Sequence, residues 1–303
     1  MRIVFLGTPA FARTILAGLL DHGIEVPLVV TQPDRIVQQR GRGKEPEPSA
    51  VARYAHEKGL TVRSPEKLTE VSQELRAAKP DAFVVASFGQ IIPSDLLKPK
   101  PPWVNVHASL LPKYRGASPI SQAILDGEAQ TGISLMAVTD GLDEGPVYAT
   151  TEVPISDQDT TETLTEKLAA VSVPALLESI SSIIDGSLQA DPQEEADASY
   201  AEKLTKISGR IDWEKGANYL DRFVRAMQPW PGAWTEAEGQ RVVFLEVSAA
   251  DDLDAPPGTF DGPPLRVVTG DGTLAITKLK PAGKAAMDGD DWLRGYRGDR
   301  RFV

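Results

Sequence analysis

The sequence of 303 residues contains no cysteine, which excludes several kinds of chemistry at once. Without thiols a chain has no disulfide framework, no thiolate nucleophile and no cysteine-ligated zinc or iron–sulfur site. The side chains left for catalysis are those of histidine, aspartate, glutamate, asparagine, serine, lysine and tyrosine. The lack of cysteine is compatible with a reducing compartment, so we expect a cytoplasmic protein.

Long hydrophobic runs and an excess of positive charge are missing as well. We find no run that approaches the roughly 18 apolar residues of a membrane span, and no apolar core of a signal peptide near residue 1, so we expect no membrane association. The formal net charge of −11 argues against indiscriminate binding of polyanions. Residues 35–44 are a basic exception with four cations and no acid, which favours one defined contact over a broad basic track.

A chain of this length exceeds the usual size of one domain, and 41% of its residues are hydrophobic, enough for a large core and a smaller second one. The residues around 190–198 are polar, acidic and poor in apolar side chains. We therefore place a first domain at residues 1–188, a linker at 189–206 and a C-terminal domain at 207–303.

Strands and helices alternate through the first part of the chain, which predicts a doubly wound, mostly parallel, Rossmann-like α/β sheet. The expected strands are 2–6, 25–30, 60–62, 81–86, 103–106, 132–138 and 147–153, and the expected helices are 12–22, 49–58, 65–78, 117–125 and 161–184. Residues 35–48 are expected to form a loop. Short β-rich runs after residue 207, at 242–247, 265–268 and 273–280, predict a small β-barrel.

The turn after the first strand has no Gly-x-Gly-x-x-Gly pattern, so we interpret it as a tight turn that opens a crossover helix rather than as a dinucleotide site. Among the three histidines, His22 and His56 lie near helix ends and are expected to be ordinary surface residues. A single central histidine with scattered acids offers no metal-ligand spacing, and we expect no metal site.

The strongest chemical signal lies at Asn105 and His107, which share one face of a strand because side chains alternate along it. The glycine-rich loop after a later strand carries Asp143. If adjacent strands bring these residues together, they form a set of amide, imidazole and carboxylate that suits acyl transfer to an amine without a covalent enzyme intermediate.

In that scheme Asn105 donates a hydrogen bond to the developing oxyanion, and His107 donates to it or moves a proton. Asp143 holds the imidazole in one tautomer. Ser109 lies close by, but it lacks the Gly-x-Ser-x-Gly elbow of a serine hydrolase, so we do not expect it to be a nucleophile.

The segment 105–120, together with 141–145, resembles the folate-dependent formyltransferases, which move a formyl group from 10-formyltetrahydrofolate to an amine. The resemblance extends over nearly the whole chain through further motifs at 7–12, 31–35, 41–44, 211–213, 229–233 and 281–284. These flanking motifs resemble the members that act on methionyl-initiator tRNA. The resemblance therefore implies this amine as the acceptor, translation initiation as the role, and a monomeric enzyme.

By the same resemblance, Asn105, His107 and Asp143 are catalytic. The implied folate-binding residues are Ser109, Leu110, Leu111, Pro112, Phe88, Gly89, Gln90, Ile91, Ile92, Thr139, Asp140, Gly141 and Leu142. Arg42 and Lys44 are implied to contact the tRNA, and the C-terminal barrel, similar to an oligonucleotide-binding fold, to follow its phosphates. The chain departs from the family at residues 45–47, Glu-Pro-Glu, and at Ser87-Phe88.

Two other functions stay open on the sequence. One is a formyltransferase for a small amine, such as an amino sugar or a purine precursor. The other is a nucleotide- or folate-binding module without turnover, in which the three polar residues would have come together by accident.

Overall fold

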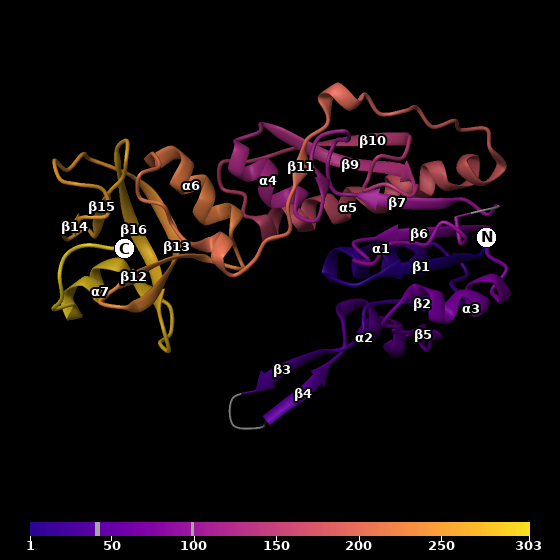
Figure 1. The fold of residues 1–303 in the computed structure, drawn as a ribbon, viewed down its shortest axis with the longest axis horizontal. Helices are drawn as coiled ribbons and strands as arrows, with labels where there is room; N and C mark the ends of the chain where they lie inside the picture. The colour runs from indigo at the N-terminus through magenta and orange to yellow at the C-terminus, as the bar shows by residue number, and fades with distance from the viewer. Residues whose placement is uncertain (40–42, 98–99) are drawn as a thin grey trace. The chain divides into compact units, whose positions relative to one another are not determined.

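The computed structural model describes residues 1–39, 43–97 and 100–303, and they form two compact units (Figure 1). The N-terminal unit comprises residues 1–119, 130–154 and 165–202, and the C-terminal unit comprises 120–129, 155–164 and 203–303. The units therefore interleave along the chain, because the short segments 120–129 and 155–164 belong with the C-terminal residues.

The N-terminal unit contains a seven-stranded sheet in the order β10-β9-β7-β6-β1-β2-β5. The neighbouring strands β7, β6, β1, β2 and β5 are parallel, whereas β9 and β10 pair antiparallel with their neighbours. This confirms the predicted mostly parallel sheet. The strands are β1 (Ile3–Gly7), β2 (Val29–Val30), β5 (Val62–Arg63), β6 (Ala82–Ala86), β7 (Trp103–His107), β9 (Gln130–Ala137) and β10 (Val147–Pro154).

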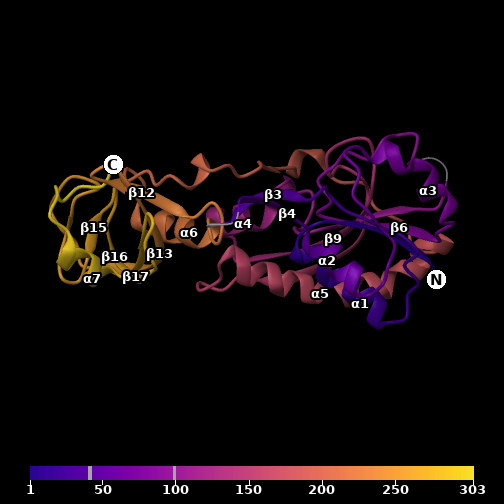
Figure 2. The same ribbon diagram turned by 90° about the horizontal axis from the view of Figure 1, so that it is seen from below.

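Helices cover both faces of this sheet. Figure 2 shows α1 and α5 together on one side and α3 on the other. The packing of α1 on α5 is close, because a Cβ atom added to Gly18 would lie 2.4 Å from a methyl group of Val173. The helices of this unit are α1 (Ala10–Asp21), α2 (Ala50–Glu57), α3 (Ser72–Ala77) and α5 (Thr161–Asp185), with 3₁₀ turns η1 (Leu68–Val71) and η2 (Glu195–Asp197).

The helix predicted over 65–78 is split into η1 and α3. Its buried residues explain the split. Leu68 and Val71 are three positions apart, the spacing of a 3₁₀ turn, whereas Val71 and Leu75 are four apart, as in an α-helix. Both spacings turn the same apolar face toward the sheet.

Helix α5 is long and apolar enough to span a membrane by length and composition alone, with a mean hydropathy of 1.5 over its most apolar window. Its most buried residues are Leu164, Leu168, Ser172, Leu176 and Ile180. They recur at multiples of four, which is the spacing of a helix that packs one face on a core.

The prediction of a loop at 35–48 was wrong for most of these residues. Strands β3 (Arg35–Gln39) and β4 (Gly43–Glu47) pair antiparallel as a separate hairpin, with residue 35 opposite residue 47. The high content of glycine, proline and charge concealed the β-branched pair Ile36-Val37, which favours a strand. Pro46 is tolerated because a two-stranded ribbon consists of edge strands only.

One face of the sheet carries the core that leads to the predicted site. Val4, Leu6 and Val85 belong to a buried cluster in which the rings of Phe83 and Trp103 stack with centroids 3.9 Å apart. Since Asn105 and His107 follow Trp103 in steps of two along β7, they lie on this same face.

The C-terminal unit is built on a six-stranded antiparallel sheet, which confirms the predicted smaller β domain. Its aromatic core includes Phe244, Phe260 and Phe302, and Trp292 stacks on Phe302 and Tyr296. The strands are β12 (Ala233–Ala237), β13 (Gln240–Ala250), β14 (Phe260–Asp261), β15 (Arg266–Val268), β16 (Thr273–Pro281) and β17 (Met287–Asp288). The helices are α4 (Pro119–Asp126), α6 (Ala217–Ala226) and α7 (Gly289–Gly295), with a 3₁₀ turn η3 (Ile207–Gly209).

Candidate active site

The structure brings the amide, imidazole and carboxylate together. Strand β7 carries Asn105 and His107, and the neighbouring antiparallel strand β9 leads into the loop that returns with Asp143. The Asn105 Nδ2 atom donates to Asp143 Oδ1 at 3.3 Å, and Asp143 Oδ2 lies 3.7 Å from His107 Nδ1. His107 is 7% exposed and Asp143 16%, so both lie where water is largely excluded.

The tautomer of His107 follows from a partner that the sequence did not indicate. The His107 Nε2 atom lies 2.9 Å from the carbonyl oxygen of Tyr114. A carbonyl only accepts hydrogen bonds, so Nε2 carries a hydrogen and donates it. Nδ1 is therefore the nitrogen that faces Asp143 and can gain or lose a proton during a reaction. The sequence assigned the control of the tautomer to Asp143, whereas this geometry gives it to Tyr114.

Asp143 is held by its backbone surroundings as well. Its Oδ2 atom accepts a hydrogen bond of 2.8 Å from the Gly116 N–H group. Asp143 has a φ of 52° and Tyr114 a φ of 62°, both in the left-handed region. That conformation costs a non-glycine residue about 1 kcal/mol, and residues held in it are concentrated at functional sites.

Ser109 is placed as a structural residue. It is fully buried, and its hydroxyl donates to the Lys113 carbonyl at 2.6 Å. The buried Ser134 on β9 fixes the same loop, because its hydroxyl accepts from the Leu111 N–H at 3.0 Å and donates to the Ser109 carbonyl at 2.7 Å. The segment 109–112 is thereby tied to the sheet, and the Ser109 hydroxyl is committed to a carbonyl.

The two other segments predicted to bind folate are anchored in one core and expose apolar side chains. Phe88 and Ile92 are buried in the cluster of the sheet face, and Val138 packs on that cluster. Ile91, between Phe88 and Ile92, is 85% exposed, and Leu142, four residues after Val138, is 62% exposed. Both side chains are therefore accessible to a ligand.

A buried polar atom in the segment 139–142 also lacks a partner. The Thr139 hydroxyl oxygen is buried and has no hydrogen bond in the part of the chain that the structure describes. Buried polar atoms are normally paired, so this hydroxyl is suited to a ligand group.

Of the two residues predicted to contact tRNA, Arg42 lies outside the described residues, and Lys44 is described only by its backbone in β4. The prediction for these side chains stays a prediction. His22 and His56 are exposed, as the sequence indicated. No group of three or more His, Asp or Glu side chains that could hold a metal ion occurs among the described residues.

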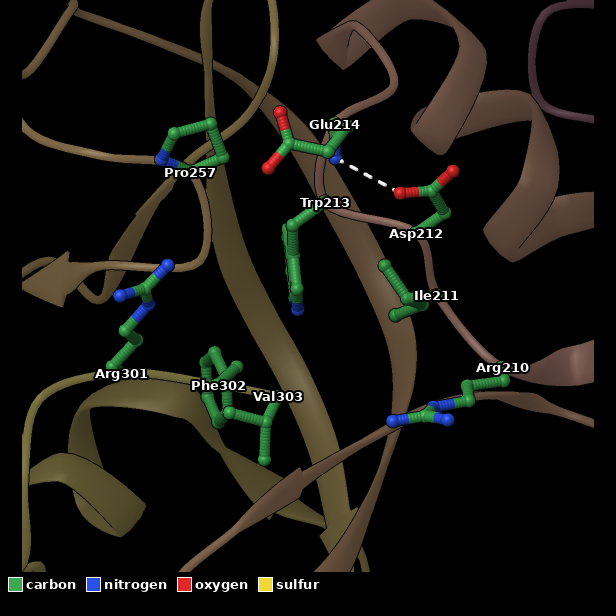
Figure 3. A pocket seen from close by; sticks show the side chains of 9 residues that line it. All are labelled: Arg210, Ile211, Asp212, Trp213, Glu214, Pro257, Arg301, Phe302 and Val303. Atoms are coloured by element: carbon green, nitrogen blue, oxygen red, sulfur yellow. Dashed lines mark hydrogen bonds between the residues drawn. The ribbon is translucent and has the colours of Figure 1, made fainter.

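The C-terminal unit contains a cavity of about 490 Å³ (Figure 3). In that view Arg301 and Arg210 lie at opposite sides of the cavity with Trp213 between them, and the Asp212 carboxylate accepts from the Glu214 N–H at 3.1 Å. The cavity has no imidazole and no side-chain amide among its lining residues. The amide, imidazole and carboxylate needed for acyl transfer therefore lie together on the sheet face and not in this cavity.

The segment predicted as a linker contributes residues that the sequence analysis missed. Its strand β11 (Tyr200–Ala201) pairs parallel with β8 (Arg115–Gly116). Gln193 hydrogen-bonds to the carbonyl oxygens of Asp143 and Gly145 at 2.8 and 2.7 Å. A polar stretch without periodicity gives no sign of such contacts.

Arg115 is the buried charge beside these residues, with 1% of its side chain exposed. Burial lowers the pKa of Arg115, but the hydrogen bonds to Tyr200 and Glu195 outweigh that effect, so the pKa lies above its usual value. The guanidinium group therefore stays charged and directional at this position.

Comparison with known proteins is consistent with this geometry. Residues 1–180 match the family model described as formyl transferase, and residues 203–297 match that of the formyl transferase C-terminal domain. The methionyl-tRNA formyltransferase of Marinobacter nauticus is 40% identical over an alignment that covers 97% of this chain and 96% of that protein.

Two solved structures share the fold at low sequence identity. HypX from Aquifex aeolicus in complex with tetrahydrofolic acid is 20% identical with a TM-score of 0.66, over 97% of this chain and 47% of the HypX chain. This chain thus spans about half the length of HypX. Methionyl-tRNA formyltransferase from Clostridium thermocellum is 15% identical with a TM-score of 0.60, over 82% of this chain and 94% of that one.

Proposed function

The chain belongs to the formyl transferase family, and we propose that it transfers the formyl group of 10-formyltetrahydrofolate to the free α-amine of methionyl-initiator tRNA. The observation that carries the proposal is the convergence of Asn105, His107 and Asp143 on one sheet face. It is supported by the 40% identical methionyl-tRNA formyltransferase, which matches both units of this chain.

The reaction forms a C–N bond between the amine and the formyl carbon and breaks the bond from that carbon to N10 of the folate. The formyl oxygen gains negative charge in the transition state. The Asn105 amide, which already donates at 3.3 Å to a carboxylate, is a donor for that oxygen. Donors placed in this way typically contribute about 10²- to 10³-fold in rate.

His107 and Asp143 manage the proton that the attacking amine must lose. With its Nε2 hydrogen bound to the Tyr114 carbonyl, the imidazole has Nδ1 as its exchangeable position, and Asp143 lies 3.7 Å from that atom. A proton taken up at Nδ1 is stabilised by the carboxylate and can be passed on to the departing nitrogen, as a general base and then acid does. Alternatively the protonated Nδ1 donates to the oxyanion, and both roles use the same atom.

The formyl donor is proposed to lie against the surface of segments 88–92, 109–112 and 139–142. Exposed Ile91 and Leu142 offer apolar contact with a pteridine ring, and the unpaired Thr139 hydroxyl offers a hydrogen bond to its edge. The folate supplies an activated formyl group, and the residues of the chain bind it and orient it.

The proposal assigns the catalytic side chains to residues 1–188 and tRNA binding to residues 207–303, while residues 189–206 connect the two and also contact the site. Arg42 and Lys44 are proposed to contact the acceptor stem, and the aromatic-rich β domain to follow phosphates. Such an enzyme of translation initiation works as a monomer in the cytoplasm and needs no membrane.

A formyltransferase for a small amine, an amino sugar or a purine precursor, is the alternative. It shares the chemistry but would not depend on the proposed contact of Arg42 with the tRNA. Replacement of Arg42 would leave its activity in place, whereas the tRNA enzyme would bind its acceptor less well.

The experiment is an acceptor comparison with the purified full chain and 10-formyltetrahydrofolate. Charged initiator tRNA, a nucleotide-linked amino sugar and an amino purine precursor are offered separately, and the products are identified by mass spectrometry. Formylated methionyl-tRNA is expected. Formylation of a small amine alone would establish the alternative, and no product from any acceptor would favour a binding module.

A further inference from the structure

Gln193 has every polar atom of its side chain engaged at the candidate active site. Its Nε2 group donates both hydrogens, to the carbonyl of Asp143 at 2.8 Å and to that of Gly145 at 2.7 Å. Its Oε1 atom accepts from Arg115 Nε at 3.0 Å. The side chain therefore links the loop that carries Asp143 to the strand that follows Tyr114.

Arg115 gives Gln193 a rigid anchor. Its guanidinium is almost fully buried, and Nη1 donates to Glu195 Oε2 at 2.9 Å and to the Tyr200 hydroxyl at 3.3 Å. A buried charge needs such partners, and losing one leaves it uncompensated. Because the planar guanidinium fixes the direction of each N–H bond, it also fixes the position of the Gln193 amide.

Ser199 adds contacts to the backbone of Tyr114 and Arg115. Its hydroxyl accepts from the Tyr114 N–H at 2.9 Å, and its carbonyl accepts from the Arg115 N–H at 2.8 Å. Segment 193–200 thus binds the backbone of both Asp143 and Tyr114, which have left-handed conformations. It contacts the carbonyl of Asp143 and the N–H of Tyr114. These two residues present the groups that face the two nitrogens of His107.

We propose that Gln193 is a positioning residue for formyl transfer, and that segment 193–200 holds Asp143 and Tyr114 in the strained conformations that align His107. The inference rests on the function proposed above. Gln193 does not touch the reacting atoms and acts through Asp143. Its loss is expected to change the rate of the chemical step more than the binding of substrates.

The test is a double-mutant cycle in steady-state formylation kinetics, with Gln193→Ala, Asp143→Asn and the double variant. Because a displaced catalytic group can cost up to 100-fold, Gln193→Ala is expected to lower kcat about 10- to 100-fold, with the KM for 10-formyltetrahydrofolate within threefold. In the Asp143→Asn background the same change is expected to cost less than about threefold, because residues that act through each other are not additive. An equal loss in both backgrounds, or an unchanged kcat in the single variant, overturns the proposal.

Gln189→Ala is the matched control, because Gln189 lies shortly before segment 193–200, is exposed, and donates to the Gly186 carbonyl at 2.6 Å. It is expected to keep wild-type kinetics. Gln193→Met preserves length and bulk without hydrogen bonds. If Gln193→Ala does not fold by circular dichroism, the Met variant decides by the same criteria.

A measurement without substrate separates this proposal from the proposed function. The Gly116 N–H is bound to Asp143 Oδ2, so its hydrogen exchange by NMR reports how firmly the carboxylate is held. Faster exchange is expected in Gln193→Ala and Gln193→Met but not in Gln189→Ala, whether or not the protein formylates tRNA. Unchanged exchange in the Gln193 variants overturns the positioning role, and an inactive wild type with this exchange pattern overturns only the assigned acceptor.

Discussion

The Nδ1 atom of His107 lies 3.7 Å from the Oδ2 atom of Asp143. The same oxygen accepts the Gly116 N–H at 2.8 Å, while the other oxygen accepts from Asn105 at 3.3 Å. One carboxylate therefore sets the mutual position of the amide and the imidazole, and substitutions in this set have separable effects.

Asn105→Ala is expected to lower kcat about 10²- to 10³-fold, the usual cost of removing one oxyanion donor. Its side chain is only partly buried, so the fold should survive. Asn218→Ala, an exposed asparagine of α6, is the matched control. A kcat within twofold of wild type for Asn105→Ala would remove the amide from the mechanism.

Asp143→Asn keeps the shape of the side chain but replaces one acceptor oxygen with a donor group. Because the amide no longer stabilises a proton taken up at His107 Nδ1, kcat is expected to fall about 10²- to 10⁴-fold, the usual contribution of general acid–base catalysis. Asp157 is exposed, and Asp157→Asn is the control in the same steady-state formylation assay. If both variants retain full activity, the carboxylate has no role in proton handling.

Ser109→Ala tests the exclusion of a serine nucleophile. Because the hydroxyl is buried and donates to the Lys113 carbonyl, its loss should cost about 0.5–1.5 kcal/mol of unfolding free energy, while kcat stays within about tenfold of wild type. Denaturant titration and kinetics measure the two quantities. Complete loss of turnover in a folded variant, or a formyl-serine adduct by mass spectrometry, would contradict the direct-attack mechanism.

Gly116→Ala is expected to destabilise the site strongly. Gly116 has a φ of 113°, and an added Cβ atom would lie 2.7 Å from the Ala201 carbonyl oxygen. Roughly 1–3 kcal/mol of strain follows. Gly186→Ala is the control, because that glycine also has a positive φ but nothing within 4 Å of the added atom. Equal effects of the two substitutions on denaturant unfolding would show that the close approach to β11 is unimportant.

The free energy of unfolding should fall more steeply at alkaline pH than it would if Tyr148 were fully solvated. Burial raises the pKa of Tyr148 above its ordinary value of 10.0, so the unfolded chain loses this proton at a lower pH than the folded chain does. The unfolded state then binds fewer protons, and the free energy of unfolding falls as pH rises through that window. Tyr148→Phe should flatten the fall in melting temperature between about pH 9 and 11. Identical slopes for the two proteins would contradict this assignment.

The sequence predicted the parts of the molecule that depend on local periodicity. Alternation along β7 placed Asn105 and His107 on one face, and the glycine-rich loop with Asp143 followed a neighbouring strand. The contacts of Tyr114 and Gln193 could not be predicted. They are made by a backbone carbonyl and by a polar segment, neither of which carries a pattern, and they depend on tertiary packing. The β3–β4 hairpin was missed for a related reason, because its composition is that of a loop.

The most direct test of the central claim is the single-turnover transfer of a labelled formyl group from 10-formyltetrahydrofolate to methionyl-initiator tRNA, by the wild-type chain and by His107→Ala. We expect wild-type protein to yield N-formylmethionyl-tRNA, and His107→Ala to be slower by about 10²- to 10⁴-fold, the usual contribution of a general acid–base group. Equal rates for the two proteins, or no formylated tRNA with the wild type, would contradict the claim.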